Sequence, residues 1–155
     1  MKNNSGIIFH FYSSKAWVPV IKVKTNCEFD HMASEIPGVG IYESTVLKGV
    51  TKSFTHSREP IISMGLPFYK ESKKGVEYIK FLDNQVGKGF DLKAAIFGFW
   101  GYKCESDDKW YCSELGDTYF PRYLGEGSHI KTTIEPKVLI AKIDSFLLGL
   151  SEKEK

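Results

Sequence analysis

A cysteine between aromatic and small polar residues is the first place in this sequence where chemistry is expected. The stretch Trp110-Tyr111-Cys112-Ser113-Glu114 has the composition of the opening turn of a helix. A thiol there would lie near the positive end of the helix dipole, beside amide groups that have no partner within the helix. Such surroundings favour the reactive thiolate, and the same amides can hold the oxyanion that forms when a carbonyl is attacked. Cys112 is therefore a candidate nucleophile.

A histidine and a carboxylate far upstream are candidates for the rest of a thiol site. His31 lies in a strand-like run, and its imidazole can reach the thiol if the strand face that it shares with Ala33 meets the helix of Cys112. Glu43 follows on the opposing strand of a predicted hairpin. With the Pro37-Gly38 turn near the midpoint, we expect the two side chains almost directly across from each other. Cysteine, histidine and an orienting carboxylate are the parts of a thiol hydrolase or transferase.

Each of these residues also has an ordinary explanation. Cys112 could be a buried core thiol, because free cysteine is among the most buried residue types. His31 could be a partly exposed strand residue, and Glu43 could face solvent, in which case Glu35 is an alternative partner for the imidazole. Tyr12 could donate a hydrogen bond to an oxyanion, although core packing explains it about as well.

Ser113 and several further residues complete the set of candidates. Ser113 is a candidate for oxyanion or substrate binding, and Asp91 is better explained as a helix cap than as a catalytic acid. The histidines and cysteines show no close ligand spacing, so neither a metal site nor a cofactor is predicted. A disulfide between Cys104 and Cys112, across a loop, stays open as the basis of a redox function. The weaker candidates are His10, His56, His129, Cys27 and Cys104.

Length and composition predict a single domain, residues 1–150, with a frayed charged tail at 151–155. The chain is 42% hydrophobic and 26% charged with a net charge of +2, so neither nucleic-acid binding nor stable membrane insertion is expected. Without a signal-peptide pattern we expect a cytoplasmic location, and delivery by a phage or another signal-independent route stays open. The sequence does not specify an oligomeric state.

Local patterns predict an α+β fold, with an antiparallel sheet or barrel packed against helices. The sheet is expected to carry the candidate histidine and carboxylate, and a helix the cysteine. Strands are predicted at 7–12, 27–36, 39–46, 51–56 and 61–66; helices are predicted at 15–21, 71–86, 90–99, 111–123 and from about 132 onward.

The order of these motifs resembles the circularly permuted papain-like proteins of the NlpC/P60 superfamily. Within it the likeness is to the YiiX/YaeF-like branch, which also resembles the lecithin retinol acyltransferase group. The likeness spans about residues 7 to 140. That branch has a Ser-His pair where this chain has Asp30-His31, and an EA…GV pattern where this chain has Glu43-Ser44 and Gly49-Val50. It has a YD pair where this chain has Phe90-Asp91, and an aromatic-Cys-Ser-Glu motif that corresponds to Tyr111 to Glu114.

This resemblance implies a permuted papain-like fold with Cys112 as nucleophile, His31 as general base and Glu43 as the orienting residue. Asp30, Ser44 and Phe90 depart from the pattern and leave this triad intact. The implied activity is that of a hydrolase or acyltransferase on an amide or ester bond, with a peptidoglycan peptide or a lipid as substrate, in bacteria or their phages. The alternative is a non-catalytic binding or structural module, associated with a virion or a cell wall.

Overall fold

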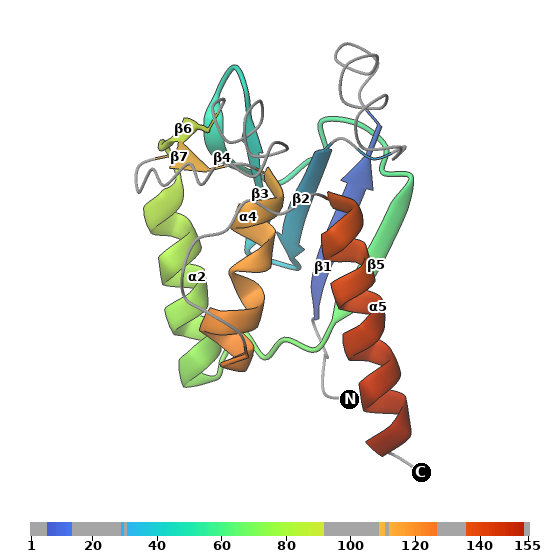
Figure 1. The fold of residues 1–155 in the computed structure, drawn as a ribbon. Helices are drawn as coiled ribbons and strands as arrows, with labels where there is room; N and C mark the ends of the chain where they lie inside the picture. The colour runs from blue at the N-terminus through green and yellow to red at the C-terminus, as the bar shows by residue number, and fades with distance from the viewer. Residues whose placement is uncertain are drawn as a thin grey trace.

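The computed structural model describes residues 6–13, 29, 31–91, 109–110, 112–126 and 136–153. They form an α+β fold in which helices lie against one face of an antiparallel sheet (Figure 1). The strands are β1 (Ile7–Tyr12), β2 (His31–Ile36), β3 (Gly40–Thr45), β4 (Gly49–Ser53) and β5 (Ile62–Leu66), with a short pair β6 (Gly89–Phe90) and β7 (Lys109–Trp110). The helices are α2 (Lys73–Gln85), α4 (Cys112–Asp117), the π-helix η2 (Phe120–Leu124) and α5 (Pro136–Lys153).

The main sheet has the strand order β4-β3-β2-β1-β5, and every neighbouring pair is antiparallel. Within the described residues β4 and β5 are its two edges, so the sheet is open and the predicted alternative of a barrel is wrong. The register places Tyr12 opposite His31 and Ala33 opposite Glu43. The candidate residues of the sheet therefore lie on its central strands.

The core fills the space between the sheet and the helices. Phe9, Phe11 and Met32 point toward the helices and are at most 1% exposed. Their burial removes apolar surface from water, which is the main favourable contribution to folding. A Cβ added at Gly116 would lie 2.6 Å from Met32 Cε, so the missing side chain lets α4 approach β2 closely.

The predicted strands and the helix at 71–86 are confirmed, with bounds that shift by a few residues. Phe90 was predicted to open a helix but pairs with Trp110 in a parallel bridge between β6 and β7. The helix predicted at 111–123 consists of α4, a turn and η2. Proline is tolerated in a first helical turn, so Pro121 lies at the start of η2 and does not end the helix.

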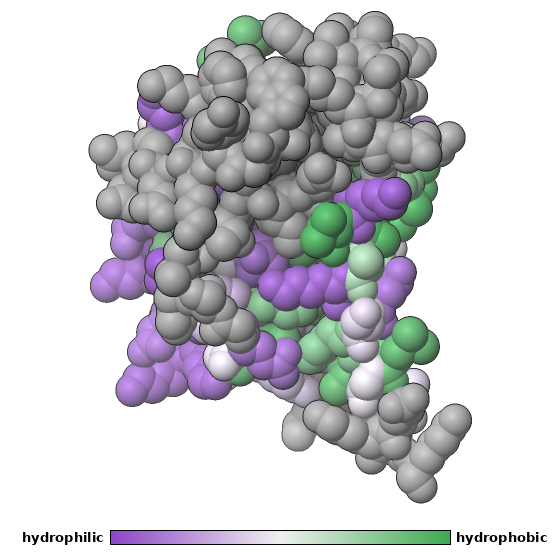
Figure 2. Space-filling view, viewed as in Figure 1, coloured by the Kyte–Doolittle hydropathy of each residue, from purple (hydrophilic) through white to green (hydrophobic). Residues whose placement is uncertain are grey.

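Helix α5 continues to Lys153, so Ser151 to Lys153, which were predicted to belong to the tail, lie in this helix. Figure 2 shows hydrophilic side chains gathered over α2, and paler or hydrophobic ones over α5. Val138 and Leu148 are 52% and 67% exposed on α5. Among the described residues, no helix combines the length and the apolar character that crossing a bilayer requires.

Candidate thiol site and a second histidine cluster

His31 and Glu43 form a hydrogen-bonded pair, with 3.0 Å between His31 Nε2 and Glu43 Oε2. Their side chains are 9% and 13% exposed. The prediction that they lie directly opposite each other is wrong, because Glu43 pairs with Ala33. The turn spans residues 37–39 and is centred on Gly38, at φ 77°, so Glu43 pairs two residues further along β2 than expected. His31 reaches Glu43 diagonally along the same face, which side chains of this length can span.

Cys112 is the first residue of α4 and is 3% exposed, and hydrogen bonding between its thiol and His31 is one of the causes that raise the pKa of this imidazole. The expected route to this contact is wrong. Met32 faces α4, so alternation along β2 directs His31 and Ala33 to the opposite face, where Ala33 packs with Tyr12 and Ile41. His31 is the first residue of β2.

A buried serine fixes the segment that leads into α4. Ser44 Oγ donates a hydrogen bond to the carbonyl of Trp110, at 2.6 Å. The indole of Trp110 donates to Gln85 Oε1 at 3.0 Å, which ties the same residue to α2. Trp110 is thus held on β3 beside Glu43, two residues before the cysteine. The sequence pattern gave Ser44 only as a departure from alanine and did not suggest this role; Tyr111 lies outside the described residues.

The surroundings of His31 favour its protonated form. Burial lowers the pKa of this imidazole, but hydrogen bonds to Cys112 and Glu43, together with their charges, outweigh burial and raise the pKa to about 9. The hydrogen bond from His31 in turn lowers the pKa of the Glu43 carboxyl. At neutral pH the imidazole therefore carries its proton while the carboxylate is ionised.

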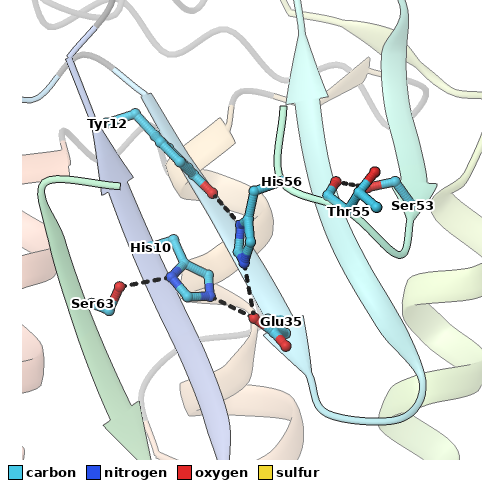
Figure 3. A network of polar contacts seen from close by, with 7 residues as sticks. All are labelled: His10, Tyr12, Glu35, Ser53, Thr55, His56 and Ser63. Carbon is cyan, nitrogen blue, oxygen red and sulfur yellow. Dashed lines mark hydrogen bonds and ion pairs between the residues drawn. The ribbon is translucent and has the colours of Figure 1, made fainter. Parts of the chain in front are cut away.

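The two residues predicted to assist at the oxyanion have different surroundings. The Tyr12 ring lies beside His31, with 5.8 Å between ring centroids, but its hydroxyl is 3.1 Å from His56 Nδ1 (Figure 3). Burial and the charge of Glu43 raise the pKa of Tyr12 to about 12, so the phenol is neutral. Ser113 is fully buried in α4. Their oxyanion roles stay predictions.

A second histidine cluster lies on the same face of the sheet as His31, as the register of β1 and β2 shows. Its side chains are drawn in Figure 3. His10 Nε2 is 2.8 Å and His56 Nε2 is 3.4 Å from Glu35 Oε2, while His10 Nδ1 is 2.8 Å from Ser63 Oγ. Glu35, considered above as a partner for His31, pairs with these two histidines. Burial lowers the pKa of His10, and the hydrogen bond to Glu35 offsets part of this effect.

Sequence spacing gave no signal for this cluster, because β1, β2 and the segment between β4 and β5 each contribute one of its ionisable residues. His129, Cys27 and Cys104 lie outside the described residues, so their predicted minor roles and the Cys104–Cys112 disulfide are not addressed. Asp91 is buried and its amide donates to the Trp110 carbonyl at 3.2 Å. The helix that Asp91 was predicted to cap also lies outside the described residues.

Comparison of the chain with models of protein families, with curated proteins and with solved structures gives no match. The resemblance to permuted papain-like proteins therefore stays a prediction, carried by the order of the motifs. The contacts of His31 with Glu43 and Cys112 support a function independently of this resemblance.

Proposed function

We propose that the chain is a cysteine hydrolase or acyltransferase that acts on an amide or ester bond. The observation that carries this proposal is the 3.0 Å hydrogen bond between His31 and Glu43, together with the Cys112 thiol, whose interaction with the same imidazole raises the pKa of that ring. A general base that links a nucleophile to an orienting acid is the shared feature of cysteine and serine acyl-transfer sites. The order of histidine, glutamate and cysteine along the chain supports a permuted papain-like fold of the NlpC/P60 type.

The pair of Cys112 and His31 would carry out the chemistry. In the first step the Cys112 thiolate attacks the substrate carbonyl carbon and a tetrahedral oxyanion forms. His31 then gives its proton to the leaving nitrogen or oxygen, the bond to the leaving group breaks, and a thioester remains on Cys112. Water or an acceptor hydroxyl or amine attacks the thioester, His31 takes up the proton of the attacking group, and the thiolate is released.

The supporting residues have separate tasks in this scheme. Glu43 engages Nε2 of His31, which leaves Nδ1 as the ring atom for proton transfer with the thiol. The amide of Cys112 is the first donor expected at the oxyanion. Tyr12 is the second, although its hydroxyl would have to leave His56 to act there. The substrate that the resemblance implies is a peptidoglycan peptide or a lipid, in a bacterial or phage setting.

One observation favours a second candidate, a non-catalytic binding or structural module. Cys112 is only 3% exposed, as a structural thiol would be. Such a module has no use for an acyl-enzyme intermediate. The two candidates therefore differ in whether an acyl group is ever found on this sulfur.

The test is acyl transfer from 4-nitrophenyl acetate, an activated ester, followed by intact-protein and peptide mass spectrometry. We expect one acetyl group on Cys112, no adduct in Cys112→Ala, and normal acylation in the matched variant Cys27→Ala. Absence both of an adduct and of Cys112-dependent release of 4-nitrophenol in the folded wild-type chain would contradict the enzyme. Equal labelling of Cys27, Cys104 and Cys112 would do so as well, because it would reveal thiols of ordinary reactivity.

A further inference from the structure

We propose that His10, Glu35 and His56 form a binding site for one divalent transition-metal ion, with Zn²⁺ as the ion that fits best. One ligand atom from each residue lies within 4.8 Å of the other two. The three side chains come from different parts of the chain and converge on one point (Figure 3). This site is separate from the pair of His31 and Glu43, and it does not depend on the proposed hydrolase activity.

The distances suit coordination with small adjustments. Zinc binds imidazole nitrogen and carboxylate oxygen at about 2.0–2.2 Å, so neighbouring ligand atoms of a tetrahedral site lie about 3.3–3.5 Å apart. The separations from Glu35 Oε2 to the Nε2 atoms of His10 and His56 are 2.8 Å and 3.4 Å. The first is a hydrogen-bond length that must widen by about 0.5 Å when an ion replaces the shared proton.

The outer nitrogens of both imidazoles already have partners. His10 Nδ1 is 2.8 Å from Ser63 Oγ, and His56 Nδ1 is 3.1 Å from the hydroxyl of Tyr12. Histidines that bind metals almost always use the other ring nitrogen in this way, which fixes the ring orientation. A hydroxyl can donate or accept a hydrogen bond, so both Nδ1 atoms keep their partners when the proton on Nε2 gives way to a metal.

Charge and exposure define the kind of ion. Two neutral imidazoles and one carboxylate carry a charge of −1, which a divalent cation reverses. Imidazole suits zinc and neighbouring transition metals, whereas calcium and magnesium prefer oxygen ligands. The side chains of His56 and Glu35 are 35% and 26% exposed while that of His10 is 7% exposed. The open side leaves a fourth position for water, as in zinc sites with three protein ligands.

The test is a titration of the full chain with Zn²⁺, after metal has been removed by dialysis against a chelator. It is run in a Cys112→Ala background so that the thiol cannot bind the ion. We expect one ion per chain, an affinity reduced at least 100-fold by His56→Ala, and an unchanged affinity in the control variant Glu77→Gln, at an exposed position of α2. Ser63→Ala should weaken binding by about 10- to 100-fold, because this hydroxyl orients His10.

Two results would overturn the site. One is the absence of stoichiometric binding, as expected for a hydrogen-bonded network without an ion. The other is binding that survives His56→Ala with unchanged affinity. His56 lies outside the strands and is partly exposed, so its replacement leaves the core intact, and circular dichroism verifies the fold.

A second readout locates the ion in the wild-type chain. Co²⁺ bound by two imidazoles and a carboxylate gives visible absorption without a thiolate-to-cobalt charge-transfer band. We expect this spectrum, together with a rise in Tm under saturating Zn²⁺, and we expect both to vanish in His56→Ala. A thiolate band would place the ion at a cysteine and contradict the proposal. Loss of acylation in Cys112→Ala with metal binding retained would keep the two sites distinct.

Discussion

Two histidine–glutamate pairs lie on the same face of the sheet, and the pKa of the histidine is raised in one pair and lowered in the other. The distance between the imidazole Nε2 and the carboxylate Oε2 is similar in the two pairs, 3.0 Å for His31–Glu43 and 2.8 Å for His10–Glu35. The pKa of His31 is raised to about 9, whereas that of His10 is lowered. Burial lowers the pKa of both histidines, so the difference between their pKa values comes from the third partner. That partner is a thiol at His31 and a second imidazole at His10. A paired carboxylate therefore does not by itself define what a histidine does.

Tyr12 joins the two regions. Its ring lies against His31, and its hydroxyl contacts His56 in the second cluster. If the second cluster holds an ion, Tyr12 orients one of its ligands and is committed to that site. If it does not, the hydroxyl can turn toward an oxyanion beside His31. Substitutions in either pair can therefore test whether the two regions differ in function.

The largest effect is expected from His31→Gln, which removes the base from one pair and leaves the other unchanged. A general base contributes about 10²- to 10⁴-fold to rate, so acylation of Cys112 should slow by that factor. Stopped-flow release of 4-nitrophenol measures it, and His129→Gln is the matched control with an unchanged rate. Equal acylation rates in wild type and His31→Gln would show that His31 is no more a catalytic base than His10.

The contributions of His31 and His10 to the free energy of unfolding should depend on pH in opposite ways. The folded pKa of His31, about 9, exceeds its ordinary value of 6.5, so its contribution is complete below pH 6.5 and is lost as pH rises through 9. The contribution is at most about 3 kcal/mol. For His10 the folded pKa is depressed, so its contribution is present above pH 6.5 and is lost as pH falls.

Urea unfolding of wild type and His31→Gln between pH 6 and pH 9.5 measures the first of these contributions. We expect the difference in free energy of unfolding between the two proteins to shrink as pH rises. A difference that stays constant over this range would contradict the raised pKa of His31.

A smaller effect is expected from Glu43→Gln, which keeps the shape of the carboxylate and removes its charge. Glu43 is the second partner that raises the pKa of His31, so the imidazole should titrate about 1 pH unit lower. Loss of orientation should also slow acylation about 10-fold. Glu77→Gln, at an exposed position of α2, is the control. Unchanged titration and rate in Glu43→Gln would show that the carboxylate is a bystander.

The smallest effect is expected from Ser44→Ala, which removes the buried hydrogen bond to the Trp110 carbonyl. The loss should lower the free energy of unfolding by about 1 kcal/mol. The partly exposed Ser53 also donates to a carbonyl, that of Thr55, so Ser53→Ala is the control and should change stability by less than about 0.5 kcal/mol. Equal costs measured by urea unfolding for the two variants would remove Ser44 from the account of how α4 is positioned.

Local patterns were sufficient to predict the strands, and they selected Cys112, His31 and Glu43 as candidates, whose catalytic roles stay predictions. A short apolar run located β1, and the composition around Cys112 located the start of α4. The register of β2 and β3 could not be predicted, because it depends on whether the turn has two or three residues. Long-range contacts were also beyond reach: Phe90 pairs with Trp110 across the chain, and the cluster around Glu35 combines residues from three separate segments.

The central claim is that His31 holds its proton at neutral pH because of the thiol beside it. The most direct measurement is an NMR titration of the His31 imidazole in the wild-type chain and in Cys112→Ala. We expect a midpoint near pH 9 in the wild type and a markedly lower one in Cys112→Ala, where burial remains and the thiol is gone. A midpoint at or below 6.5 in the wild type, or the same midpoint in both proteins, would contradict the account.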